Sequence, residues 1–114
     1  MYFVDRSAVV LKPTQAFLDW LKSTDENMPD LTLPQLQSNC TTLLVPEYEL
    51  PEEIIGYLGE RFNQIFEAEL AGWEIDRSLW PEMNLTQFWH FFTVEVHDTV
   101  LDLVDADLQI STID

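Results

Sequence analysis

The stretch PEEIIGYLGERFNQIFEAEL, residues 51–70, decides the fold. Pro51 suits the first turn of a helix, where no backbone donor is needed, and Glu52 and Glu53 favour the positive end of the helix dipole. Large apolar residues then recur every three or four positions, which places them on one helix face: Ile54, Leu58, Phe62, Ile65, Phe66 and Leu70. The spacing predicts one long helix that ends near Gly72 and Trp73, with an apolar face that a second layer must cover.

Three segments rich in β-branched and aromatic residues supply that second layer. They are YFVDRSAVVL (2–11), CTTLLV (40–45) and TVEVHDTVLDLV (93–104). The first has apolar residues on both of its faces, which predicts a strand that is largely covered on both sides. In the last, the apolar residues change parity between Val96 and Leu101, so we expect a β-bulge near Asp98–Thr99.

Shorter helices are predicted around the strands. One follows Pro13 and runs to about Lys22, and residues 23–30 (STDENMPD) then form a surface loop. Thr32 with Gln35, and Asn84 with Gln87, have the spacing of helix N-caps with capping-box partners. We therefore expect short helices after Thr32 and Asn84.

Taken in order, these elements are β–α–(α)–β–α–α–β, an α+β fold in which helices cover a small three-stranded sheet. With 114 residues and 46% apolar composition, the chain fits one domain over residues 1–104, followed by a loosely ordered acidic tail over residues 105–114. Trp80, in the connector before Asn84, is expected to bury its ring while its indole N–H finds an acceptor.

The charge of the chain restricts its partners. The formal net charge is -16, and residues 39–114 carry sixteen acidic and two basic residues, a net charge of -14. Nucleic acids and anionic membranes need Lys and Arg to neutralise phosphate, so we expect no direct nucleic-acid or membrane binding. A basic protein is the natural electrostatic match.

Cofactor and compartment signals are few. Cys40 is the single cysteine, so no internal disulfide forms, and the start of the chain has no signal-peptide pattern, which predicts a cytoplasmic location. No stretch of about eighteen apolar residues predicts a transmembrane helix. Gly56, Gly59 and Gly72 do not form a phosphate-binding loop, and HExxH and paired CxxC motifs are absent, so we expect no cofactor and no metal site.

A weak catalytic candidate lies in the last strand. Glu95 and His97 share one face by period-two alternation, and a carboxylate beside an imidazole can orient it as a general base or ligand. Arg6, in the first strand, is expected to pair with Glu95 or another carboxylate, and His90 lies one short helix away. A hydrogen-bonded sheet histidine and a structural ion pair explain the same residues, so the sequence assigns no catalytic residue.

The acidic residues with the clearest geometry are spaced by seven along the predicted long helix: Glu53, Glu60, Glu67 and Glu74. Seven residues make nearly two helical turns, so at least the first three lie on one line, about 10 Å apart. A solvated helix face explains such a line as well. We take these four residues as candidate partner-binding residues.

Five further segments form a recognisable combination: DRS (5–7), VPEY (45–48), ELAGW (69–73), SLWP (78–81) and FFTVEVH (91–97). Together they resemble a family of short, acidic, uncharacterised bacterial proteins. The resemblance spans most of the chain and implies a bacterial origin and a shared fold. It implies no activity and no site residue.

Three functions remain open at this stage. The leading hypothesis is a non-enzymatic interaction protein that binds a basic protein, for example as a DNA mimic or as an immunity-type inhibitor. The second is a small hydrolase or metal-dependent enzyme centred on Glu95, His97 and Arg6. The third is a structural subunit whose exposed aromatic residues form a homodimer, so the chain is a monomer or a homodimer.

Overall fold

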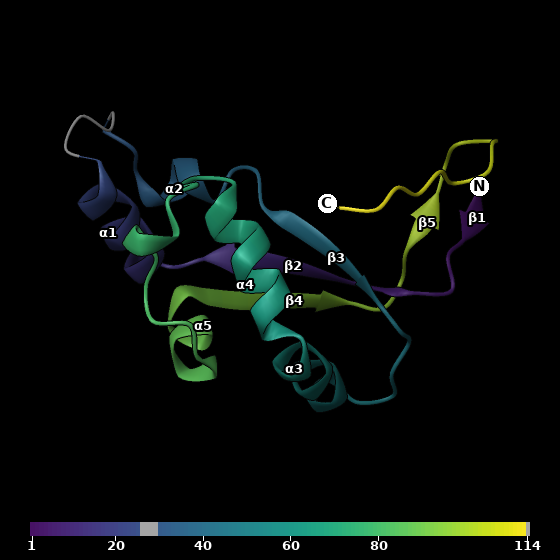
Figure 1. The fold of residues 1–114 in the computed structure, drawn as a ribbon. Helices are drawn as coiled ribbons and strands as arrows, with labels where there is room; N and C mark the ends of the chain where they lie inside the picture. Colours follow the sequence, from purple (N-terminus) through teal and green to yellow (C-terminus); the bar gives the residue numbers. More distant parts are fainter. Residues whose placement is uncertain (26–29, 114) are drawn as a thin grey trace.

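The computed structural model describes residues 1–25 and 30–113 and has an α+β fold (Figure 1). Its elements run in the order β1 (Tyr2–Phe3), β2 (Ser7–Pro13), α1 (Gln15–Thr24), α2 (Leu33–Leu36), β3 (Thr41–Val45), α3 (Pro51–Glu60), α4 (Phe62–Ala71), the 3-10 turn η1 (Arg77–Leu79), α5 (Leu85–Phe91), β4 (Phe92–His97) and β5 (Leu101–Asp102). The predicted fold class is confirmed. Residues 26–29 of the predicted surface loop lie outside the described residues, and Ser23 and Thr24 belong to α1.

A three-stranded antiparallel sheet in the order β3–β2–β4 forms the centre of the fold. Along β2 the side chains alternate between fully buried positions, such as Val9 and Leu11, and half-buried ones, such as Ala8 and Val10. The cross-strand partners of Ala8 are Leu44 and His97, and both are exposed. The helices therefore cover one face of the sheet only, which corrects the expectation that both faces of the first strand are covered.

Both long predicted strands are interrupted at one place. Ala8 pairs with His97 in the main sheet, whereas Val4 donates its amide hydrogen to Val100 and Phe3 pairs with Leu101 in the separate β1–β5 sheet. Residues 5–7 therefore lie opposite only two residues, 98–99. We call this irregular segment the joint. It lies where the bulge was predicted, but the extra residue is on the first strand, and the joint divides one ladder into two sheets.

The predicted long helix is also divided, because Arg61 has a non-helical backbone (φ -118°, ψ 11°). Its guanidinium lies over the Tyr57 ring, 3.6 Å from the centroid, and Nη1 donates to the Tyr57 carbonyl at 3.1 Å. That carbonyl is the one that the Arg61 amide bonds in a regular α-helix. The amide instead donates to Leu58 at 3.0 Å, so the helix tightens and ends, and α4 begins in a new direction.

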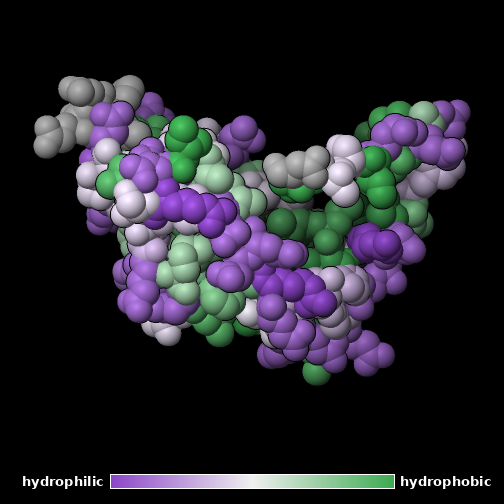
Figure 2. Space-filling view, in the orientation of Figure 1, coloured by the Kyte–Doolittle hydropathy of each residue, from purple (hydrophilic) through white to green (hydrophobic). Residues whose placement is uncertain are grey.

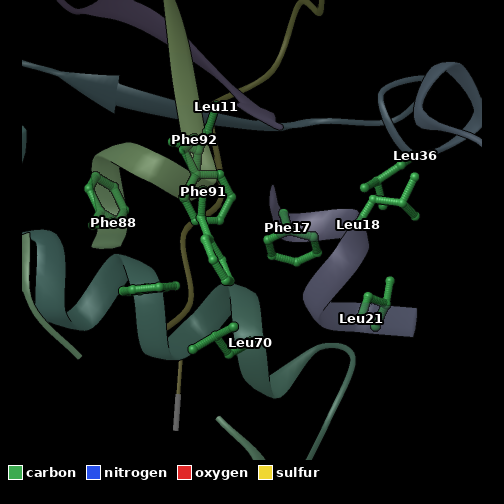
Figure 3. Packing of buried hydrophobic residues seen from close by; sticks show 10 residues of the cluster. Leu11, Phe17, Leu18, Leu21, Leu36, Leu70, Phe88, Phe91 and Phe92 are labelled. Carbon is green, nitrogen blue, oxygen red and sulfur yellow. The ribbon is translucent and has the colours of Figure 1, made fainter. Parts of the chain in front are cut away.

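The core lies between the sheet and the helices, in two parts. The larger part brings together aromatic and leucine side chains from α1, α2, α4, α5 and the adjoining strands, and Figure 3 shows them pointing toward one another: Leu11, Phe17, Leu18, Leu21, Leu36, Phe66, Leu70, Phe88, Phe91 and Phe92. The smaller part joins α3 to the sheet through Val9, Val45, Ile54 and Leu58. The apolar face predicted for residues 51–70 thus points inward in both helices.

Both predicted N-caps are present. Thr32 and Gln35 form the complete capping box, in which the Gln35 amide donates to the Thr32 hydroxyl and the Thr32 amide donates to Gln35 Oε1. Asn84 Oδ1 accepts from the Gln87 amide at 2.7 Å. Local side-chain chemistry therefore fixes where α2 and α5 begin.

Beyond the joint, β1, β5 and residues 103–113 form an arm. Its two strands extend away from the helices, and its last residues turn back toward β3 and α4 (Figure 1). Residues 103–113 have no helix or strand, and their side chains are exposed. Many of the arm's side chains are large and apolar, including Phe3 at 83% exposure and Ile110 at 90%. Figure 2 shows hydrophobic surface on the arm and in the recess between the arm and the body.

Candidate functional site

The Glu95–His97 pair lies on the open face of the sheet. Glu95 Oε1 is 3.9 Å from His97 Nε2, and Glu95 Oε2 is 3.8 Å from Lys12 Nζ. The shared face of Glu95 and His97 is as predicted from their alternation. All three side chains are more than one-third exposed, so water screens these contacts.

Arg6 does not belong to this pair. It lies in the joint, before β2 begins, and its Nη1 contacts the Asp5 carboxylate at 2.9 Å and the Asp5 carbonyl at 2.8 Å. Arg6 was expected to pair with Glu95 or another carboxylate across the sheet; it pairs instead with Asp5, its neighbour in the chain, and Lys12 of β2 supplies the cation near Glu95. Of the three residues of the proposed hydrolase, only Glu95 and His97 are therefore brought together.

His90 adds nothing to this pair. It lies at the end of α5, whereas His97 is the last residue of β4, so the length of the strand separates them. Within residues 1–25 and 30–113, no three His, Cys, Asp or Glu side chains are grouped in a way that suits a metal ion. The Glu95–His97 pair is an exposed surface pair, and the described residues add no third side chain that would complete a metal site.

The line of four glutamates spaced by seven residues is bent, and two of its carboxylates lie beside arginines. Glu53 and Glu60 lie on α3 and Glu67 on α4, on either side of the break at Arg61. Glu60 contacts Arg61 at 3.5 Å, and Glu67 contacts Arg77 at 3.8 Å. Glu74 lies beyond α4, where its carbonyl accepts from the Trp80 indole at 2.8 Å.

The densest acidic segment is the loop that leads into α3 together with the first turn of α3, which the seven-residue spacing did not single out. We call residues 47–53 (EYELPEE) the acidic loop; its four carboxylates are Glu47, Glu49, Glu52 and Glu53. All four residues are exposed, and none of them forms an ion pair with a described lysine or arginine. The close spacing of these four carboxylates along the sequence was the signal that could have identified the segment.

Beside the acidic loop there is a cavity of about 410 Å³ that no sequence pattern indicated. It is lined by Ser7, Tyr48, Glu49, Leu50, Pro51, Ile54, Val96, His97, Asp98 and Thr99. Ser7 occupies the buried face of β2, the same face as Val9, but at a point where α3 has only just begun. The helical cover stops there and leaves the sheet end open beneath the loop.

A second recess, about 720 Å³, runs between β3 and α4. Leu43, Ile65 and Ala68 form its apolar part, and Ser111 and Ile113 of the arm also line it. Glu69 lies at its edge. Burial raises the pKa of the Glu69 carboxyl, while a hydrogen bond from the Thr41 side chain acts in the opposite direction and lowers it.

Replacing Glu69 with glutamine is expected to raise the melting temperature at about pH 7 and to have little effect at about pH 4. A raised pKa in the folded state means that folding is favoured below the ordinary value of 4.5 and that this contribution is lost as the pH rises through the folded pKa. Glutamine removes the cost of the buried charge and still offers an oxygen to Thr41. Circular dichroism melts at both pH values measure the difference.

Glu82→Gln is the matched control for this prediction, since Glu82 is exposed and the substitution removes the same charge. It separates the effect of a smaller net negative charge on the protein from the effect of no longer burying the Glu69 carboxylate. Equal stabilisation by the two substitutions at pH 7, or a lower melting temperature for Glu69→Gln, contradicts the assignment.

Comparison of the chain with protein-family models, curated proteins and solved structures finds no match. Among the described residues, none of the helices combines the length and the apolar character that crossing a membrane requires. The function must therefore be argued from the surface itself.

Proposed function

We propose that this chain is a non-enzymatic protein-binding domain whose acidic surface engages a basic protein. The observation that carries the proposal is the acidic loop, where four exposed carboxylates lie within seven residues without an ion-pair partner among the described residues. Carboxylates that are already paired offer less to a partner, because that partner must first replace the internal cation. Unpaired carboxylates make the local electrostatic potential more negative, and this potential steers a basic protein toward them.

The candidate residues Glu53, Glu60, Glu67 and Glu74 have different weights in this proposal. Glu53 belongs to the acidic loop and is the strongest of the four. Glu60 and Glu67 are shared with Arg61 and Arg77, and Glu74 lies off the helix. We propose that the partner contacts the acidic loop first and that the other three extend the contact.

A matched pair of variants tests this order, each with four carboxylates changed to the corresponding amides. The loop variant changes Glu47, Glu49, Glu52 and Glu53 to Gln; the helix variant changes Glu60, Glu67, Glu74 and Glu82 to Gln. Immobilised wild-type protein is exposed to a bacterial lysate at about 50 mM and about 500 mM NaCl, and the bound proteins are identified. We expect a defined basic protein at low salt, reduced binding at high salt because the charges are screened, and a larger loss for the loop variant than for the helix variant.

Two versions of the partner are separable in the same experiment. If the chain mimics DNA, added duplex DNA competes for the partner, since carboxylates and phosphates then occupy one site. If the chain is an immunity-type inhibitor, the partner is a toxin or nuclease whose activity falls when the chain is added. Salt-insensitive capture, or equal capture by wild type and both variants, contradicts the acidic-surface proposal.

A second candidate function, a homodimeric subunit, is favoured by the arm. Phe3, Leu103 and Ile110 are each at least three-quarters exposed, and the two-stranded β1–β5 sheet has free outer edges that a second copy can pair with. Light scattering tests this candidate, with an expected mass of twice 13.3 kDa for wild type. A variant with Phe3→Ser and Leu103→Ser is expected to be monomeric, and a monomeric wild type contradicts the candidate.

We also propose that the chain is a cytoplasmic bacterial protein of the acidic family that it resembles. The half-buried thiol of Cys40, its single cysteine, is consistent with a reducing compartment. Recovery of the tagged protein in the soluble cytoplasmic fraction of a bacterial host tests the location.

A further inference from the structure

We infer that the cavity beside the acidic loop is a binding pocket for a long cationic side chain, an arginine or a lysine, presented by the partner. This inference rests on the proposed function, because it names the part of a basic partner that the surface recognises. Four features of the cavity support it: its position beside the acidic loop, the hydroxyl of Ser7, the apolar part of its walls and its acidic rim.

The hydroxyl of Ser7 lies at the cavity. The residue is 1% exposed and is one of the residues that line the cavity. Its hydroxyl can therefore accept a hydrogen bond from a ligand donor that enters the cavity.

Part of the cavity wall is apolar and suits an aliphatic stem. Ile54 of α3 and Val96 of β4 lie on the helix-covered side of the sheet, with Leu50 and the Tyr48 ring from the acidic loop beside them. Lysine and arginine bury their methylene groups against such surfaces and keep the charged end near polar groups. The volume of about 410 Å³ exceeds what a single side chain requires, so water shares the cavity.

The rim of the cavity determines the sign of the ligand. Glu49 from the acidic loop and Asp98 from the joint both line the cavity, and no lysine or arginine does. Neither carboxylate forms an ion pair with a described cation. His97, the remaining titratable side chain of the lining apart from Tyr48, is 57% exposed and lies toward Glu95. Together with the net charge of -16, this rim repels an anion and favours a cation.

An arginine and a lysine side chain both satisfy this chemistry, and capped amino acids distinguish between the two ligands. Acetyl-arginine methylamide and acetyl-lysine methylamide are titrated into ¹⁵N-labelled protein, and backbone amide shifts are followed by NMR. Acetyl-citrulline methylamide is the matched neutral control, since it has nearly the shape of arginine without its charge. We expect saturable shifts at Ser7, Val96 and Asp98 for at least one cation and none at these positions for citrulline.

Three substitutions test the assigned atoms. Glu49→Gln and Asp98→Asn are each expected to weaken binding of the cation by about twofold to fivefold, as the loss of a solvent-exposed ion pair does. Ser7→Ala is expected to weaken it by a smaller factor, because a neutral acceptor is lost. Glu82→Gln is the control, because it removes one charge from a residue that does not line the cavity, and it is expected to leave binding unchanged. The same spectra report whether each variant is folded.

The inference is overturned if citrulline binds as well as arginine, if Glu49→Gln and Asp98→Asn match Glu82→Gln, or if shifts follow the acidic surface in general without saturation. Such a result leaves the proposed function standing when wild type still captures the basic partner at low salt and the loop variant loses it. Conversely, a pocket that binds arginine, in a chain that captures no basic protein, removes the proposed function and retains the pocket.

Discussion

Replacing Phe88 with alanine is expected to lower the free energy of unfolding by about 3–5 kcal/mol, as for other fully buried phenylalanines. Phe88 has no exposed surface and lies at the centre of the larger core. Its ring is 5.6 Å from the Phe66 ring and 5.3 Å from the Phe92 ring, measured between centroids. The alanine variant leaves a cavity between α4, α5 and β4 that these rigid rings fill poorly.

The loss is a large share of the roughly 5–15 kcal/mol that stabilises a domain of this size. Urea unfolding followed by circular dichroism measures it. Thr86→Ala is the control on the same helix, because Thr86 is exposed, and a change within about 0.5 kcal/mol is expected there. If Phe88→Ala does not fold, Phe88→Leu keeps part of the volume and gives an intermediate loss. A loss of less than about 1 kcal/mol for Phe88→Ala shows that the ring is not in the core.

The core was largely predictable because its signal is local. The apolar face read from residues 51–70 is buried or half-buried at each of its six positions, and the two short helices begin at the residues whose side chains cap them. Periodicity and capping depend on neighbours three or four residues away. The sequence therefore contains the information directly.

The breaks were less predictable because they depend on competition for backbone groups. At Arg61, one guanidinium takes the carbonyl that the helix needs, and the apolar stripe continues past this point without interruption. At the joint, the parity change near Asp98–Thr99 correctly indicated an irregularity. It did not indicate that the extra residue lies on the opposite strand, at residues 5–7, or that the ladder divides into two sheets.

The candidate site was likewise predictable only in part. Alternation placed Glu95 and His97 together, and their 3.9 Å contact agrees, but pairing between strands gave Glu95 the cation Lys12 rather than Arg6. The cavity at Ser7 depends on where the helical layer stops above the sheet, which no local pattern reports. Leu103 and Ile110 likewise have the composition of core residues, yet the arm holds them away from the core.

Replacing Trp80 with alanine is expected to cost about 2–3 kcal/mol, less than for a fully buried aromatic residue because the ring is only half-buried. Its position is nevertheless well defined. The indole N–H donates to the Glu74 carbonyl at 2.8 Å, the Arg77 guanidinium lies 4.8 Å from the ring centroid, and the ring packs against the larger core. These contacts attach the connector between α4 and α5 to the body.

Trp80→Phe separates the two contributions of the indole. Phenylalanine retains an apolar ring but no N–H donor, so its loss reports mainly the hydrogen bond, about 0.5–1.5 kcal/mol. The remaining difference between Trp80→Phe and Trp80→Ala then reports the packing of the ring. Ile75→Ala, at a position in the same connector that is 90% exposed, is the control and is expected to change stability by less than about 0.5 kcal/mol. Urea unfolding of the three variants measures these values, and equal losses for Trp80→Phe and Trp80→Ala show that the hydrogen bond alone, and not the ring, attaches the connector.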